Sequence, residues 1–158
     1  MMHERKNDDR GAMVYAILRE TRPLVLNSAR VVEASLRDDR LSVGMRAVLE
    51  TLAESESGPI TVPDIGDRLD LARQGIQRHV NDLITLGLAE SRTNPAHRRS
   101  VLIALTPAGT ALFARIRADE LSRLGAMAAE HSAADLATAA RVLESLNRDV
   151  RHRATELR

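Results

Sequence analysis

Two short helical patterns followed by two short strand patterns, all within residues 61–105, restrict the fold of this chain more than any other feature. The sequence Thr61-x-x-Asp64 has the spacing of a capping box, which predicts the start of a short helix. A second helical pattern begins at Arg73, after the short segment 70–72. Two short helices joined by so short a turn are typical of a helix-turn-helix.

A β-hairpin is predicted directly after the second helix. Residues 88–93 and 101–105 each have the length of a strand, and Asn94-Pro95-Ala96 between them favours a chain reversal. Gly87 stands where a left-handed residue would end the preceding helix. A hairpin in this position forms a wing, so residues 41–106 are predicted to be a winged helix-turn-helix domain, which contains a further helix that Ser42 caps.

Long amphipathic patterns flank this domain on both sides. Residues 13–40 carry an apolar stripe that Pro23 interrupts, so either one helix kinks at Pro23 or a second helix begins there. Residues 107–158 contain two helical patterns, of which the first begins at Pro107 after a capping Thr106. The seam of the last helix comprises Leu136, Ala139, Leu143, Leu146, Val150, Ala154 and Leu157. Since a small winged domain does not need so long a seam to cover itself, both regions are predicted to be dimerisation helices.

Composition removes several fold and function classes. A chain of 158 residues with 44% hydrophobic positions can bury a core, whereas residues 1–12, which mix both charge signs, are predicted to be a disordered tail. The lack of cysteine excludes disulfides and thiolate ligands and fits a cytoplasmic location. Aromatic residues are 1% of the chain, too few for the stacking platforms that bind single strands, and no apolar run is long enough to span a membrane. The predicted fold class is mainly α.

Positive charge is concentrated in the predicted winged domain, although the formal net charge is only +1. In the second helix, polar side chains that suit guanine and adenine edges avoid the apolar face, and they are Arg73, Gln74, Gln77 and Arg78. At the wing tip, His97, Arg98 and Arg99 are placed to follow a phosphate backbone or a narrow minor groove. An exposed Arg/Gln helix alone is usually a solvated face, but together with a basic wing it favours binding to double-stranded DNA.

The sequence resembles the MarR-type (multiple-antibiotic-resistance regulator) family of winged helix-turn-helix transcription regulators. Four blocks carry the resemblance, and they are residues 41–53, 62–69, 73–88 and 94–109, the last of which includes Leu105-Thr106-Pro107-Ala108-Gly109. The resemblance implies a homodimer that binds a pseudo-palindromic operator, usually as a repressor. It also implies that a small organic effector often releases the DNA.

Several positions depart from the family pattern. Ala72 stands where a hydroxyl residue usually caps the recognition helix, and Gly75 replaces another hydroxyl residue. Asp70 replaces a frequent glycine, although Asp tolerates a left-handed backbone better than most residues. His97 replaces the acid that would orient a wing arginine.

The ligand pocket that the resemblance implies lies near the junction of the first, second and fifth helices. That position brings Tyr15, Arg19 and Arg22 within reach of an anionic ligand. A structural tyrosine and surface arginines are the alternative interpretation, so the ligand-binding residues stay open.

The sequence contains no pattern for a cofactor, a metal or an active site. The histidines lack ligand spacing, and no phosphate-binding loop or nucleophile elbow is present. His79 and His97 are instead predicted to contact phosphate or solvent. Two other hypotheses remain: a winged-helix protein-interaction module or anti-regulator that does not bind DNA, and, with no residue set to support it, an enzyme.

Overall fold

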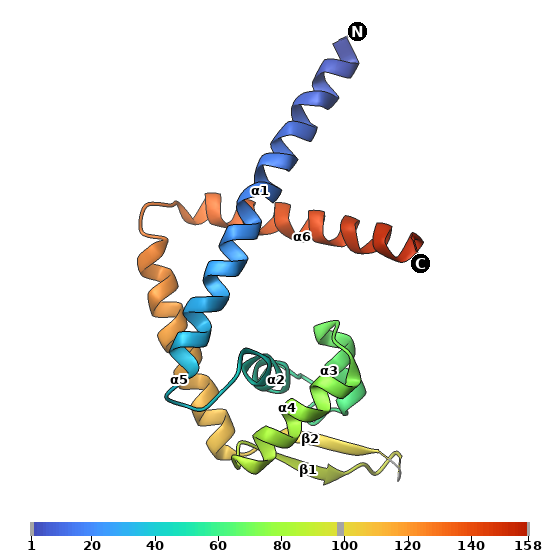
Figure 1. Cartoon of the computed structure of the whole chain (residues 1–158), viewed down its shortest axis with the longest axis vertical. Helices are drawn as coiled ribbons and strands as arrows, with labels where there is room; N and C mark the ends of the chain where they lie inside the picture. The colour runs from blue at the N-terminus through green and yellow to red at the C-terminus, as the bar shows by residue number, and fades with distance from the viewer. Residues whose placement is uncertain (1, 98–99, 158) are drawn as a thin grey trace. The chain divides into compact units, whose positions relative to one another are not determined.

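The computed structural model describes residues 2–97 and 100–157, which form a mainly helical fold with one small sheet (Figure 1). The elements are α1 Met2–Leu36, α2 Val43–Ala53, α3 Val62–Leu69, α4 Arg73–Thr85, β1 Ala89–Thr93, β2 Val101–Leu105, α5 Pro107–Met127 and α6 Ala133–Glu156. The chain divides into two compact units, residues 1–113 and 114–158. The order of elements confirms the predicted winged helix-turn-helix between flanking helical regions.

The core of the first unit lies where α2, α3 and α4 pack against one another and against the hairpin. Its largest fully buried side chains, all less than 2% exposed, are Leu36, Val48, Leu49, Ile65, Ile76, Val80, Leu83 and Ile103. Each such burial contributes about 1.5–3 kcal/mol relative to an exposed side chain. The helical spacing of these residues therefore supplies the energy that holds the helix-turn-helix together.

Side-chain caps define where the short helices begin. Ser42 accepts a hydrogen bond from the backbone N–H of Met45 at 3.1 Å at the start of α2. At the start of α3, Thr61 and Asp64 form the predicted capping box, in which the backbone N–H of Thr61 donates to Asp64 Oδ2 at 3.0 Å. The hydroxyl of Thr61 also donates to this carboxylate, and the two hydrogen bonds lower the pKa of Asp64, because they stabilise its charged form.

The wing is an antiparallel hairpin in which Ala89 pairs with Leu105 and Thr93 pairs with Val101. Ile60, before α3, adds a β-bridge to Ile103 through two hydrogen bonds of 2.7 and 3.2 Å. This bridge ties the strand segment before the helix-turn-helix to the wing. The wing and the recognition helix are thus parts of one packed unit.

The start of α5 packs tightly against the segment that follows α4. Gly87, at φ +72°, ends the α4 turn, and Thr106 donates from its hydroxyl to the carbonyl of Gly87 at 2.7 Å. The same hydroxyl accepts from the N–H of Gly109 at 3.1 Å. A Cβ at Gly109 would overlap with the backbone carbonyl of Leu88, so only glycine fits there. The predicted roles of Gly87, Thr106 and Pro107 are confirmed.

Helix α1 differs from the prediction at its start and settles the alternatives at Pro23. Residues 2–12, which were expected to be a disordered tail, lie in the helix. The helix continues through Pro23 rather than starting again there. Proline lacks the N–H that would bond to the carbonyl of Arg19, so α1 loses one hydrogen bond at this point without ending.

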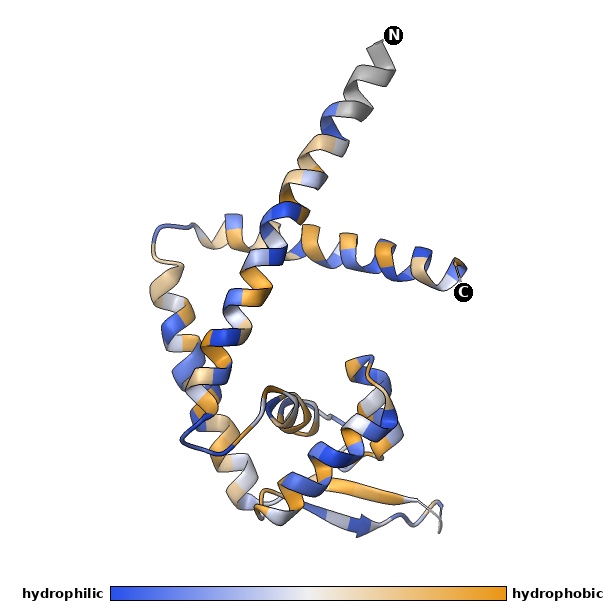
Figure 2. Ribbon diagram, viewed as in Figure 1, coloured by the Kyte–Doolittle hydropathy of each residue, from blue (hydrophilic) through white to orange (hydrophobic). Residues whose placement is uncertain are grey.

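Helix α6 has no buried residue in the chain by itself, although apolar residues recur along it. Figure 2 shows these apolar positions alternating with polar ones over the length of the helix. Leu136, Val142, Leu143, Val150 and Leu157 are among the large hydrophobic side chains that stay exposed.

Candidate DNA interface

The turn between α3 and α4 is set by Asp70, which has a left-handed backbone at φ 53° and ψ 41°. In this conformation the N–H of Leu71 reaches the carbonyl of Gly66 at 3.0 Å and closes α3. Asp70 thus takes the conformation that glycine often supplies in such turns. Ala72 is the N-cap of α4 and makes no side-chain cap, as its sequence indicated.

Helix α4 buries one side and exposes the other. Ile76, Val80 and Leu83 are buried against α2, α3 and the sheet. The predicted DNA-binding residues of this helix are all exposed, and they are Arg73, Gln74, Gln77 and Arg78. With about 100° of rotation per residue, Gln74, Arg78, Asn81 and Thr85 form the line farthest from the buried side. Gln77 flanks this line, whereas Arg73, in the first turn of the helix, projects toward the side of Val80.

Asn81 is a candidate that the sequence analysis missed. It lies on the exposed side of α4 and accepts a hydrogen bond at its Oδ1 from Nε2 of Gln77, at 3.0 Å. The only signal in the sequence was the spacing of four residues between two amide side chains, which places them one above the other on a helix. The exposed face therefore carries an amide pair as well as arginines.

The wing turn is organised by Asn94, which is buried although it is polar. Its Oδ1 accepts from the N–H of Ala96 at 3.0 Å, and its Nδ2 donates to the hydroxyl of Ser100 at 2.8 Å. His97 lies exposed at this turn. The predicted residues Arg98 and Arg99 lie outside the described residues.

One positively charged side chain of the wing, Arg92, has a partner that reduces its availability. Arg92 forms a forked pair with Glu90, in which its Nε and Nη2 lie 2.8 and 2.7 Å from Oε1. Arg92 therefore adds little to the positive charge of the wing.

His79 was predicted to contact phosphate or solvent, and the structure shows that it also packs within the fold. It is half-buried, and its ring lies so close to Gly44 of α2 that a Cβ at Gly44 would overlap with it. Its Nδ1 is buried and has no hydrogen-bond partner among the described residues. The absence of a side chain at Gly44 makes room for the ring, so His79 packs α4 onto α2.

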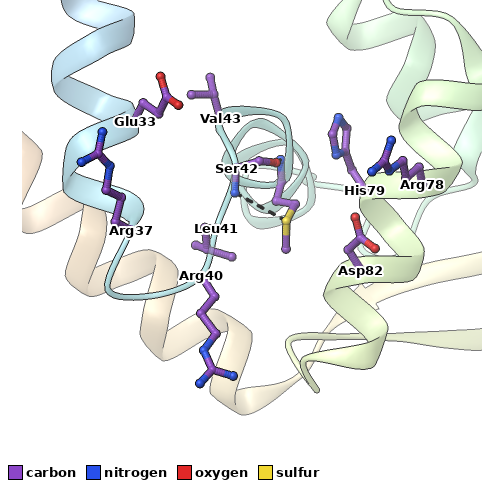
Figure 3. Close-up of a pocket in the computed structure, with 10 residues that line it drawn as sticks. Glu33, Arg37, Arg40, Leu41, Ser42, Val43, Arg78, His79 and Asp82 are labelled. Carbon is purple, nitrogen blue, oxygen red and sulfur yellow. Dashed lines mark hydrogen bonds between the residues drawn. The ribbon is translucent and has the colours of Figure 1, made fainter.

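A pocket of about 450 Å³ opens between the end of α1, the start of α2 and α4 (Figure 3). Its charged and titratable lining consists of Glu33, Arg37, Arg40, Arg78, His79 and Asp82, above apolar Leu41, Val43 and Met45. The residues suggested for a ligand are elsewhere: Tyr15 is 70% exposed, and Arg19 pairs with Glu20 at 3.2 Å. Arg78 belongs both to this pocket and to the outer line of α4.

Two kinds of feature are absent from residues 2–97 and 100–157. Within these ranges no three histidine, aspartate or glutamate side chains gather as a metal site. No helix of this part of the chain is both long and apolar enough to cross a membrane.

A helix-turn-helix followed by a β-hairpin and flanked by long helices defines the winged-helix class. The sequence profile of the MarR family matches residues 46–100. The crystal structure of the MarR family transcription regulator SP03579 is 35% identical and covers 93% of this chain and 96% of that chain, with a TM-score of 0.82. The chain therefore belongs to the MarR family, whose members are transcription regulators and not enzymes.

More distant relatives share the fold. The structure of a mutant MarR from E. coli complexed with operator DNA has a TM-score of 0.70 at 19% identity, over 81% of this chain and 91% of that chain. The S. aureus MepR–DNA complex has a TM-score of 0.72 at 14% identity, and the match covers 82% of this chain and 94% of that chain.

An uncharacterized protein of Mycobacterium tuberculosis is similar to part of the chain. It is 54% identical over 50 residues, which are 32% of this chain and 35% of the mycobacterial protein. The chain thus matches about a third of the length of that relative.

Proposed function

We propose that this chain is a sequence-specific regulator of transcription that binds double-stranded DNA as a homodimer, most simply as a repressor. The observation that carries this proposal is the face of α4, where arginine and amide side chains are exposed directly above a buried apolar core. Arginine, glutamine and asparagine are the side chains whose donors and acceptors fit base edges in the major groove. The rigid attachment of α4 to α2 and α3 favours such contacts, because the groups are held in place before DNA binds.

In this proposal α4 enters the major groove, while the wing with His97, Arg98 and Arg99 follows the adjacent backbone or minor groove. The solved DNA complexes of MarR and MepR support this arrangement, because both proteins share the fold. The open line on α4 is compatible with it, since the described residues leave Gln74 and Arg78 without a hydrogen-bond partner in the chain.

The homodimer is supported by the flanking regions, residues 13–40 and 107–158. Leu143 and Val150 of α6 are 41% and 56% exposed, and α6 buries none of its residues in the single chain. A second copy of the chain covers such a seam by the same surface on both subunits. Two-fold symmetry then places the two half-sites of the operator about one helical turn, roughly 10 base pairs, apart or a multiple of this.

Fluorescence anisotropy tests the proposal on DNA from upstream of the chain's own gene, against a scrambled duplex and at two salt concentrations. We expect tight binding to the native fragment that survives higher salt, and weak, salt-sensitive binding to the scrambled one. Arg78→Ala should lower affinity by about 1–3 kcal/mol at particular base pairs, whereas Ser145→Ala on α6 serves as the control. Equal binding to both duplexes, followed by no enrichment in a selection from genomic fragments, would favour a protein-interaction module instead.

A small organic ligand would act through the pocket beside α4. Arg37, Arg40 and Arg78 have no carboxylate partner in the described part of the chain, and apolar side chains also line the pocket, a combination that suits a small organic carboxylate. A ligand that holds Arg78 there removes it from the DNA face. Benzoate is a suitable probe: it should raise the Kd for DNA of the wild-type protein, and an Arg37→Ala/Arg40→Ala variant should respond less. An identical response of both proteins would place the ligand site elsewhere.

A further inference from the structure

Two amide side chains stand one turn apart on the exposed side of α4 and bind each other. Nε2 of Gln77 donates to Oδ1 of Asn81 at 3.0 Å. Both side chains are exposed, so the hydrogen bond is not a requirement of burial. It draws the amide of Gln77, which flanks the outer line of the helix, toward Asn81 on that line.

This hydrogen bond decides the order in which Gln77 presents its groups. A free glutamine amide can turn over and exchange its oxygen with its nitrogen. While Nε2 donates to Oδ1 of Asn81, as it does in the structure, the amide of Gln77 keeps one orientation. Gln77 is then left with an acceptor, Oε1, and one remaining N–H donor on Nε2, in a fixed sequence from one side of the amide to the other.

Among the bases, adenine has the complementary pair of groups in the major groove. Adenine offers the N6 donor beside the N7 acceptor, whereas guanine offers two acceptors, and cytosine and thymine offer one donor and one acceptor respectively. A fixed acceptor and donor on Gln77 can therefore bind adenine with two hydrogen bonds. The same fixed order opposes guanine, because Oε1 would face an acceptor.

We propose that Gln77, with its amide oriented by Asn81, reads the adenine of an A·T base pair in each half-site. The inference rests on the proposed DNA-binding function and names the base that this part of α4 selects. Asn81 is a positioning residue here, because it acts through Gln77. A merely structural i,i+4 amide pair would add slightly to helix stability and would leave base preference unchanged.

The test is selection of binding sites from a pool of random duplexes by the full-length wild-type protein. Affinities are then measured for the selected site with each base pair replaced in turn. We expect one A·T pair per half-site whose replacement weakens binding about 5- to 150-fold, the range of a two-bond base contact, and whose preference disappears in Gln77→Ala.

Three variants of Asn81 separate positioning from structure. Asn81→Leu is similar in size and favours the helix, so it should fold, yet it should reduce the adenine preference about 2- to 12-fold, the effect of one neutral hydrogen bond. Asn81→Asp keeps an acceptor for Gln77 and should retain the preference while overall affinity falls. In the Gln77→Ala background, Asn81→Leu should change the preference no further.

The outcomes distinguish this inference from the function on which it rests. If the wild-type protein selects no sequence, both the proposed function and the inference fail. If it selects a site, but the preference that depends on Gln77 is for G·C, or Asn81→Leu leaves the adenine preference intact, the function stands and the amide pair is only a helix surface contact.

Discussion

The winged-helix region and α6 have similar apolar spacing, but the apolar residues are buried in the winged-helix region and exposed in α6. In α2, α3 and α4, the residues spaced three and four apart meet one another, and Val48, Leu49, Ile65, Val80 and Leu83 are 0% exposed. In α6 the same spacing leaves every residue at least partly exposed. Helical periodicity therefore identifies which face is apolar, but it does not identify the surface that covers that face.

The physical difference lies in how many neighbours each helix has. Three short helices and a hairpin surround a common centre and remove one another's apolar faces from water. An exposed apolar seam on a long helix costs free energy unless a partner covers it. The comparison thus separates a region that is complete in one chain from a region that we propose is completed by two.

The largest expected effect concerns α6, whose apolar seam we propose is covered by a second chain. Leu143→Asp introduces a charge into the proposed dimer seam, where it would be buried without a partner, at a cost of about 3–5 kcal/mol. Sedimentation velocity should show the dimer dissociating at protein concentrations at which the wild-type chain stays dimeric. Ser145→Asp, on the opposite side of α6, is the matched control. Dissociation by both variants would show a loss of helix stability rather than a lost seam.

The next effect concerns the complete region. Leu83→Ala removes a fully buried side chain of α4 and should lower the free energy of unfolding by about 2–5 kcal/mol, from lost burial and from the cavity that remains. Urea titration at a fixed protein concentration measures it. Leu71→Ala, at a 53% exposed position in the turn between α3 and α4 and outside the proposed dimer seam, should stay within about 0.5 kcal/mol of wild type. Equal losses would contradict the comparison.

A third change tests the close contact between the start of α5 and Leu88, which lies between α4 and β1. Gly109→Ala should destabilise the fold by about 1–3 kcal/mol, because its Cβ overlaps with the carbonyl of Leu88, which cannot move aside as a side chain can. Gly125→Ala, later in α5, has no atom within 4 Å of the new Cβ and should stabilise by up to about 1 kcal/mol. Thermal unfolding of the two variants should therefore move in opposite directions.

A smaller gain in stability is expected from a substitution at the start of α4. Ala72 has the extended backbone of an N-cap but no side-chain acceptor, so Ala72→Ser should stabilise the protein by about 1 kcal/mol. Ala72→Gly is the comparison, because it adds no acceptor at the same site. If the serine variant gains no more than the glycine variant, the N–H groups of the first turn are already satisfied by water.

The smallest expected effect is the pH dependence of the contribution that Asp64 makes to stability. Its folded-state pKa lies below the ordinary value of 3.8, so its contribution to stability is fully present above that value and is lost as the pH falls through the lower folded-state pKa. The difference in unfolding free energy between wild type and Asp64→Asn should therefore shrink between pH 6 and pH 3. Because the carboxylate is exposed, we expect this difference to change only modestly. If the difference in unfolding free energy stayed constant with pH, the charge of Asp64 would not contribute to stability.

Much of the candidate interface could be predicted from local sequence. The capping box of Thr61 and Asp64, the left-handed Asp70 and the stop at Gly87 all depend on hydrogen bonds within one helical turn. The exposure of Gln74 and Arg78 follows from the positions of the apolar residues in the same helix. These features needed no knowledge of the rest of the chain.

Other features of the interface required the tertiary structure. His79 was expected to face phosphate or solvent, yet its ring packs on α2, because Gly44 leaves space that the sequence of α4 does not reveal. The amide pair of Gln77 and Asn81 was compatible with the sequence, but many exposed amides four residues apart stay unpaired.

The sequence by itself determined the class of the fold, the order of the elements in the winged region and the face of α4 that stays exposed. It did so because caps, turns and periodic apolar residues act over a few residues, where backbone geometry sets every distance. Only the tertiary structure decided that α1 continues through Pro23, that Gly109 lies against Leu88 and that His79 packs on α2. Those outcomes depend on the angles and separations between elements, which close packing of many side chains sets together.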